Sequence, residues 1–289
     1  MSVPAAFIGV ILIWSTTPLA IKWSSEGGGF LFGVTGRMLL GAALCLALVR
    51  ALRVDMPWYK NARRTYVAAG LGIYGSMISV YWGAQYIPSG LISVLYGLTP
   101  LMTGVLAAVF LGESSVTPGK LAGMAAGVAG LAVIFGVGAR TDTFAVLGMA
   151  AVLLSVFLHA VSAVWIKRIG ADLPAMAVTG GGLLVAAPLY LTTWMLAEGA
   201  LPRALPIRAM LSIVYLGTVG SVLGFILYYY ALKHMAVGRI ALITLITPVT
   251  ALLLGSFLNG EHVGMQVWAG AALIMVGLVL HQWGNRPWT

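Results

Sequence analysis

The sequence contains very little charge. Only 8% of its residues are Asp, Glu, Lys or Arg, against roughly 25% in typical soluble domains. Hydrophobic residues make up 61%, and the mean hydropathy is +1.01. So few charged side chains cannot cover the surface of a soluble domain of this size. An ordinary soluble fold is therefore excluded.

Cysteine is almost absent, and acidic residues are scarce. The one cysteine, Cys45, lies in an apolar run, so the chain can form no internal disulfide, and we expect a small buried side chain there. The net charge of +9 arises because seven acids face 16 Lys and Arg. These cations occupy short connections between apolar runs, where they set membrane orientation. We therefore expect a lipid bilayer and no nucleic acid as a partner.

Signatures of catalysis are missing as well. The chain has no His-Glu-x-x-His, no Gly-x-Ser-x-Gly and no carboxylates at metal-ligand spacing. We expect no enzyme, cofactor or metal site, and an intramembrane enzyme is only a remote alternative. A channel is disfavoured because the sequence shows neither a ring of charges nor a carbonyl filter.

Long apolar runs take the place of these features. A membrane-spanning helix needs about 20 mostly apolar residues, and ten segments meet this requirement. The sequence thus predicts an all-α integral membrane protein with ten transmembrane helices, over residues 4–22, 30–49, 65–86, 89–111, 117–137, 144–167, 175–196, 208–231, 237–258 and 265–283. With the N-terminus inside, 11 Lys and Arg lie on the cytoplasmic side and four on the other. Both termini are therefore predicted to be cytoplasmic.

The two halves of the chain repeat one another. A shift of 148 residues places Tyr81 on Tyr229 and Gly90 on Gly238. The same shift superimposes Thr99-Pro100 on Thr247-Pro248 and Gly112-Glu113 on Gly260-Glu261; after a one-residue slip Gly123 matches Gly270 and Gly130 matches Gly277. We predict two units, residues 1–140 and 141–289. Each would have five spans, an odd number, so the second must be inverted, as in many secondary transporters.

These repeated segments resemble a known family. The stretch from Gly83 to Gly90, then Leu98-Thr99-Pro100-Leu101, then Phe110-Leu111-Gly112-Glu113, is similar to the EamA unit of the drug/metabolite transporter superfamily, and the second half repeats it. Within that superfamily the chain resembles the bacterial aromatic amino-acid exporters. This resemblance implies multi-pass insertion in the inner membrane and export of amino acids from the cytoplasm by alternating access.

Two prolines occupy equivalent positions in the fourth and ninth spans. Pro100 and Pro248 each follow a threonine and free the carbonyl four residues earlier, at Tyr96 and Thr244. A membrane tolerates such a carbonyl only where another group or a cavity satisfies it. We predict helix bends at both prolines, which either border the substrate path or serve packing alone.

Helical spacing places polar and aromatic side chains on candidate inner faces of the spans. Polar groups avoid lipid, so such faces usually point into the bundle. Each side chain could line a cavity or simply bind a neighbouring helix. The candidate substrate-binding residues are Trp14, Thr17, Tyr74, Tyr81, Tyr96, Thr99, His159, Ser162, Thr244 and Thr247.

A pocket formed by these residues would be neutral and aromatic, with hydroxyl donors. It suits a neutral amino acid with an aromatic or other large apolar side chain, whereas a strongly anionic solute would require several inward arginines. Only Arg37 lies within a span, where it could also cap carbonyls or pair structurally. Other small metabolites and amphipathic drugs remain alternatives. Glu113 and Glu261 are expected to brace hairpin turns and not to relay protons, so proton coupling stays open.

Small residues form a ridge on the fifth span, at Gly119, Gly123 and Gly127. Such ridges allow helices to approach closely. We expect this ridge to pack inside one subunit, which favours a monomer over a homodimer.

Overall fold

The computed structural model describes residues 3–112, 117–141, 143–224, 227 and 237–283. Every regular element in these ranges is helical. The elements are α1 (Val3–Ser24), α2 (Gly29–Ala51), α3 (Lys60–Gly83), α4 (Ser89–Tyr96), α5 (Thr99–Leu111), α6 (Pro118–Thr141), α7 (Thr143–Ile169), α8 (Ala175–Ala197), α9 (Ile207–Tyr215), the π-helix η1 (Leu216–Leu223), α11 (Val237–Asn259) and α12 (Met265–Trp283).

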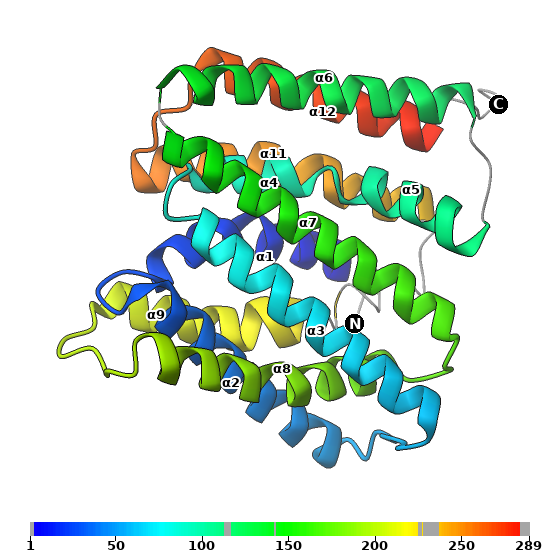
Figure 1. Cartoon of the computed structure of the whole chain (residues 1–289), viewed down its shortest axis with the longest axis vertical. Coiled ribbons are helices and arrows are strands. Elements are labelled where there is room, and N and C mark those ends of the chain that lie inside the picture. The colour runs from blue at the N-terminus through cyan, green and yellow to red at the C-terminus, as the bar shows by residue number, and fades with distance from the viewer. Residues whose placement is uncertain (1–2, 113–116, 142, 225–226, 228–236, 284–289) are drawn as a thin grey trace.

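The described residues of each of the ten expected spans are mainly helical. Five helical stretches in the described part are long and apolar enough to cross a membrane, namely Val3–Ser24, Gly29–Ala51, Ser89–Leu111, Thr143–Ile169 and Ala175–Ala197. The helices run side by side, and the start of α1 and the end of α12 lie toward the same side of the bundle (Figure 1). The chain is therefore an all-helical protein with several apolar spans, and a full set of ten crossings stays a prediction.

The fourth span is interrupted where Pro100 was expected to bend it. Helix α4 ends at Tyr96 and α5 begins at Thr99, with Pro100 in the first turn of α5. The hydroxyl of Thr99 donates a hydrogen bond to the Tyr96 carbonyl over 2.6 Å. This bond satisfies the carbonyl that the proline leaves without its helical donor. In the other half, by contrast, α11 continues as one helix through Pro248.

Helices from the two halves interlock. Helix α3 packs against α7 and α8, and its counterpart in the second half, α9 with η1, packs against α1 and α2. The outermost pair is α6 and α12, at the top of the view in Figure 1. A Cβ at Gly123 would lie 2.5 Å from the Gly277 carbonyl oxygen, and one at Gly130 would lie 2.6 Å from that of Gly270. These two helices are thus antiparallel and in backbone contact.

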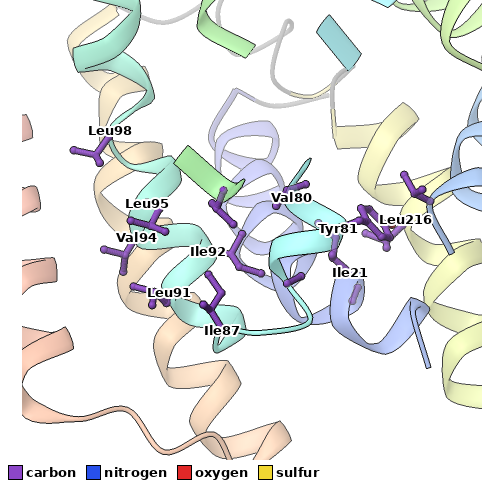
Figure 2. Close-up of a cluster of buried hydrophobic side chains, with 14 of the residues drawn as sticks. Ile21, Val80, Tyr81, Ile87, Leu91, Ile92, Val94, Leu95, Leu98 and Leu216 are labelled. Atoms are coloured by element: carbon purple, nitrogen blue, oxygen red, sulfur yellow. The ribbon is translucent and has the colours of Figure 1, made fainter. Parts of the chain in front are cut away.

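Burial differs strongly between the two ends of the bundle. All seven residues from Ser89 to Leu95 of α4 are buried. Its apolar side chains belong to one buried cluster with Ile21, Val80 and Tyr81, and Figure 2 shows Leu91, Ile92, Val94 and Leu95 of this cluster. In α5, which continues toward the other end, only Leu101 is buried. Side-chain packing is therefore dense at the end where α1 and α3 finish and much looser at the opposite end.

Candidate functional site

Polar side chains from six elements gather near the middle of the bundle. We call this group the central polar layer, and its members are Arg37 on α2, Tyr74 and Ser76 on α3, Tyr96 on α4, Ser155 on α7, Tyr190 on α8 and Ser221 on η1. With α9 and η1 counted as one continuous stretch, each lies seven to 14 residues from the helix end on the densely packed side, or about 10 to 20 Å at 1.5 Å per residue. The layer thus lies well inside the bundle, away from the helix ends, and is built from both halves.

A chain of short hydrogen bonds joins three helices within this layer. The Tyr96 phenol and the Ser155 hydroxyl lie 2.5 Å apart, and the Ser155 hydroxyl also contacts the Ser76 carbonyl over 2.5 Å. Ser155 is fully buried. The Ser76 carbonyl can only accept, so the Ser155 hydroxyl donates its single hydrogen to this carbonyl. The Tyr96 phenol must then donate to the Ser155 oxygen. This chain fixes the tyrosine ring between the two halves.

Two further tyrosines form an aromatic pair beside it. The rings of Tyr74 and Tyr190 are 5.0 Å apart between centroids. The Tyr190 hydroxyl lies 2.9 Å from the carbonyls of both Ile73 and Tyr74, and the Tyr74 hydroxyl contacts Thr193 over 2.6 Å. The phenol groups are therefore already hydrogen-bonded, so these residues present mainly ring surface.

Arg37 contributes the positive charge of the layer. Its side chain is 5% exposed, and its Nε donates a hydrogen bond to the Ser221 hydroxyl over 3.1 Å. Ser221 belongs to the π-helix η1, a rare conformation that often marks functional sites. Nη1 of Arg37 is buried and has no hydrogen-bond partner in the described part of the chain.

Of the candidate residues from the sequence, Tyr74 and Tyr96 enter the central polar layer. Thr17 bonds to the Ile13 carbonyl of its own helix, Thr99 to the Tyr96 carbonyl, and Ser162 to the Ala68 carbonyl on α3. Tyr81 is fully buried in the hydrophobic core, and Thr247 is buried in α11 next to Pro248. Trp14 is half-buried, with its indole nitrogen close to Gly224. The Thr244 side chain lies outside the described part of the structure.

His159 lies one helical turn beyond Ser155 on α7. At about 100° per residue, the two side chains are separated by about 40° around the helix axis. Along this inner face Gly148, Val152 and Ser155 are buried, yet His159 and Ala163 are exposed. The inner face of α7 is therefore fully buried toward the densely packed end, whereas toward the other end the exposed His159 and Ala163 alternate with the buried Ala160 and Val164.

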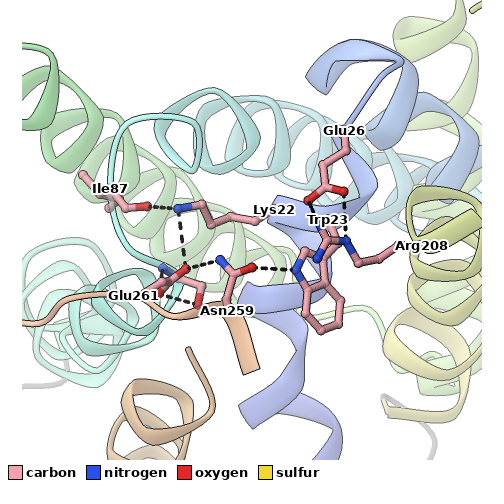
Figure 3. Close-up of polar contacts among 8 residues, drawn as sticks. Lys22, Trp23, Glu26, Ile87, Arg208, Asn259 and Glu261 are labelled. Carbon is pink, nitrogen blue, oxygen red and sulfur yellow. Dashed lines mark hydrogen bonds and ion pairs between the residues drawn. The ribbon is translucent and has the colours of Figure 1, made fainter. Parts of the chain in front are cut away.

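A polar network covers the densely packed end (Figure 3). Glu261 is 7% exposed and lies 3.5 Å from the Lys22 ammonium. It also accepts bonds from the Ser89 backbone N–H, the Ser89 hydroxyl and the Asn259 amide at 2.8 to 2.9 Å. The expectation that Glu261 braces nearby backbone donors is thus confirmed, whereas Glu113 lies outside the described residues.

The same network extends to α9. The Asn259 side chain accepts a 2.9 Å bond from the Trp23 indole, and Arg208 lies over the Trp23 ring at 5.3 Å. Arg208 forms a bidentate ion pair with Glu26 at 2.6 and 2.9 Å. The ends of α1, α4, α9 and α11 are therefore joined at this side.

Four members of the layer were missed among the sequence candidates, namely Ser76, Ser155, Tyr190 and Ser221, while Arg37 was noted without a defined role. Ser155 could have been found, because it lies one turn before His159 on the same face. Tyr190 and Ser221 had no such signal, since each depends on how its helix is rotated against its neighbours. In the described residues, no three His, Cys, Asp or Glu side chains converge as metal ligands would.

Comparison with known proteins places these features in context. The model of the EamA-like transporter family matches residues 2–136 and again residues 146–281. A probable terminal-alkyne amino-acid exporter of Streptantibioticus cattleyicolor is 28% identical over 95% of the chain and 91% of its own length. A probable amino-acid metabolite efflux pump of Salmonella typhimurium is 30% identical over 84% and 86%. The inner membrane transporter YedA of Escherichia coli is 25% identical over 95% and 89%. A solved crystal structure shares the fold with a TM-score of 0.68 at 23% identity over 99% of both chains.

Proposed function

The chain belongs to the EamA-like transporter family, and on this premise we propose that it exports neutral amino acids with aromatic or other large apolar side chains across the bacterial inner membrane. It is a transporter and not an enzyme, as its family and the names of its relatives indicate. Its substrate is a small molecule, and the described helices are those of a multi-pass membrane protein.

We infer that the transporter works by alternating access between two inverted halves, residues 1–140 and 141–289, with ten crossings and cytoplasmic termini. The reciprocal packing of α3 and of α9 with η1 supports this arrangement, as do the paired contacts of Gly123 with Gly277 and Gly130 with Gly270. The repeat places Gly123 on Gly270 and Gly130 on Gly277, so one contact maps onto the other. A pseudo-twofold axis between α6 and α12 would produce this relation.

The observation that carries the substrate class is the composition of the central polar layer. It combines hydroxyl groups with the aromatic rings of Tyr74, Tyr96 and Tyr190, and a single positive charge at Arg37. Aromatic rings accommodate large apolar side chains, and one cation complements one carboxylate. A carboxylate-free amphipathic cation would be repelled by Arg37, which disfavours the drug-transport alternative.

The test is transport into proteoliposomes that contain the purified protein. We expect saturable uptake of radiolabelled phenylalanine, tryptophan and methionine, and exclusion of glutamate, with and without an imposed pH gradient. A response to the gradient would show proton coupling, and its absence would show facilitated exchange. Failure of all four amino acids in vesicles that hold folded protein would refute the amino-acid assignment, and competition by amphipathic cations would favour drug transport.

A further inference from the structure

Within the described part of the chain, Arg37 is a buried cation without an acidic partner. The five acidic residues that the structure describes all fall in the connections between helices, so none of these five lies at the depth of the central polar layer; they are Glu26, Asp55, Asp172, Glu198 and Glu261. The two ion pairs formed by described residues join Lys22 to Glu261 and Arg208 to Glu26, both at the densely packed end of the bundle. The described residues therefore supply no anion to compensate the charge of Arg37.

Such a charge is costly to maintain. An arginine side chain cannot lose its proton in a protein, so burial cannot neutralise it. An unpaired ion in a low-dielectric interior is strongly unfavourable unless an opposite charge and hydrogen bonds accompany it. In Arg37, the Ser221 hydroxyl accepts from Nε, and Nη1 remains buried without an acceptor. An oxygen anion placed beside Nη1 would satisfy both the charge and the missing hydrogen bond.

The surroundings of Arg37 define the shape of such an anion. Helix α2, which carries Arg37, packs along α8, and the Thr35 hydroxyl two residues earlier donates to the Tyr190 carbonyl over 3.4 Å. Tyr96 belongs to the same central polar layer. Both phenol groups already have hydrogen-bond partners. The guanidinium is therefore the available donor, and the tyrosine rings of the central polar layer offer apolar surface. A small molecule with a carboxylate next to a large apolar group matches this combination.

We infer that Arg37 binds the α-carboxylate of the transported amino acid, through the guanidinium edge that carries Nη1. This inference rests on the proposed function and names the residue that selects amino acids within it. A guanidinium can hold a carboxylate through two parallel hydrogen bonds, which a lysine ammonium cannot reproduce. Arg37 also keeps its bond to Ser221, because that bond uses Nε and not Nη1.

The inference is tested by competition between phenylalanine and phenylalaninamide, which lacks the carboxylate. In the unaltered protein we expect the amide to compete at least about thirtyfold more weakly, as for loss of one partner of a buried charge pair. Arg37→Gln should weaken phenylalanine binding by a similar factor and bring the two ligands to near-equal affinity. Arg37→Lys should fall between them. Arg64→Gln, which removes an exposed cation at the start of α3, serves as the matched control and should retain the discrimination of the unaltered protein.

Several results would overturn this assignment. Equal competition by amide and amino acid in the unaltered protein would show that no carboxylate is recognised, whatever the variants do. If Arg37→Gln lowered thermal stability but kept the ratio of the two affinities, Arg37 would only brace η1. Unaltered protein that transports no amino acid at all would instead refute the proposed function, so the two failures are distinguishable.

Discussion

Ser155 shows how one side chain can connect several members of the central polar layer. Its hydroxyl lies between the Tyr96 phenol and the Ser76 carbonyl, each 2.5 Å away. We predict that Ser155→Ala lowers stability by about 1 to 3 kcal/mol, because the Tyr96 hydroxyl would remain buried without its partner. The Tyr96 ring would also lose its anchor, so the KM for phenylalanine should rise. Thermal unfolding in detergent and uptake kinetics in vesicles measure the two effects.

Thr17 provides the matched control for this change. Its hydroxyl donates to the Ile13 carbonyl of the same helix, which keeps its backbone N–H donor whether or not the hydroxyl is present. We expect Thr17→Val to alter neither stability nor KM appreciably. A Ser155→Ala protein that behaved like Thr17→Val would show that the Tyr96 ring is held by packing alone.

The sequence predicts only part of the site at this scale. Tyr74 and Tyr96 were found because polar groups in a span usually face the bundle interior. The same rule selected Thr17 and Thr99, which bond to carbonyls of their own segments. A hydroxyl in a helix can always reach the carbonyl one turn earlier, so its presence does not show that it lines a pocket.

At the scale of whole helices, α6 and α12 approach through glycine. A Cβ added at Gly123 would meet the Gly277 carbonyl oxygen at 2.5 Å and the His281 backbone nitrogen at 2.7 Å. We predict that Gly123→Ala destabilises the protein by about 1 to 3 kcal/mol through overpacking. Gly136 on the same helix has no neighbour within 4 Å of its Cβ position. Gly136→Ala should therefore be neutral or slightly stabilising, and equal melting temperatures for the two variants would contradict the close packing.

This contact also bears on oligomeric state. The ridge of small residues on α6 is occupied within the chain, since Gly123 faces Gly277 and Gly127 faces Leu98 and Leu101. A homodimer through the same face would have to displace α12. The monomer expected from the sequence is thus compatible with the packing of these helices.

Element boundaries follow from the sequence more readily than helix irregularities do. Hydropathy predicted helices that the described part of the chain contains, and five of them are long and apolar enough to cross a membrane. The Thr99-Pro100 pair indicated the break between α4 and α5. The same pair in the second half, Thr247-Pro248, lies within the continuous helix α11. The π-helix η1 had no sequence signal beyond its glycines, because π-helical geometry depends on how neighbouring helices hold the segment.

For the whole molecule, burial differs between the two ends of the bundle, as we expect for one conformation of an alternating-access transporter. The end that carries Lys22 and Glu261 is sealed by buried residues of α4 and by the polar network (Figure 3). At the other end, the inner face of α7 is exposed at His159 and Ala163. With cytoplasmic termini, this conformation would be closed to the periplasm and open to the cytoplasm.

Cysteine labelling tests this assignment, because the chain has a single native cysteine, Cys45, which is buried. In a Cys45→Ala background we predict that Ala163→Cys reacts quickly with a membrane-impermeant maleimide in inside-out vesicles. Ser24→Cys, at a position with 0% exposure beneath the network, should react slowly from the periplasmic side. Fast reaction of Ala163→Cys only in right-side-out vesicles would reverse the orientation of the chain.

The network itself should set the balance between the two conformations. Glu261→Gln removes the charge that holds Lys22 and weakens the bonds from Ser89 and Asn259. A loss of about 1.4 kcal/mol shifts a two-state equilibrium tenfold, so periplasmic labelling of Ser24→Cys should rise several-fold while labelling of Ala163→Cys falls. Arg208→Gln removes the exposed pair with Glu26 and the contact with the Trp23 ring but leaves the Lys22–Glu261 pair intact. Exposed contacts of these two types contribute little, so this variant should change neither rate by more than a small factor. Opposite changes at the two cysteines are required, because a protein that merely loosened would expose both.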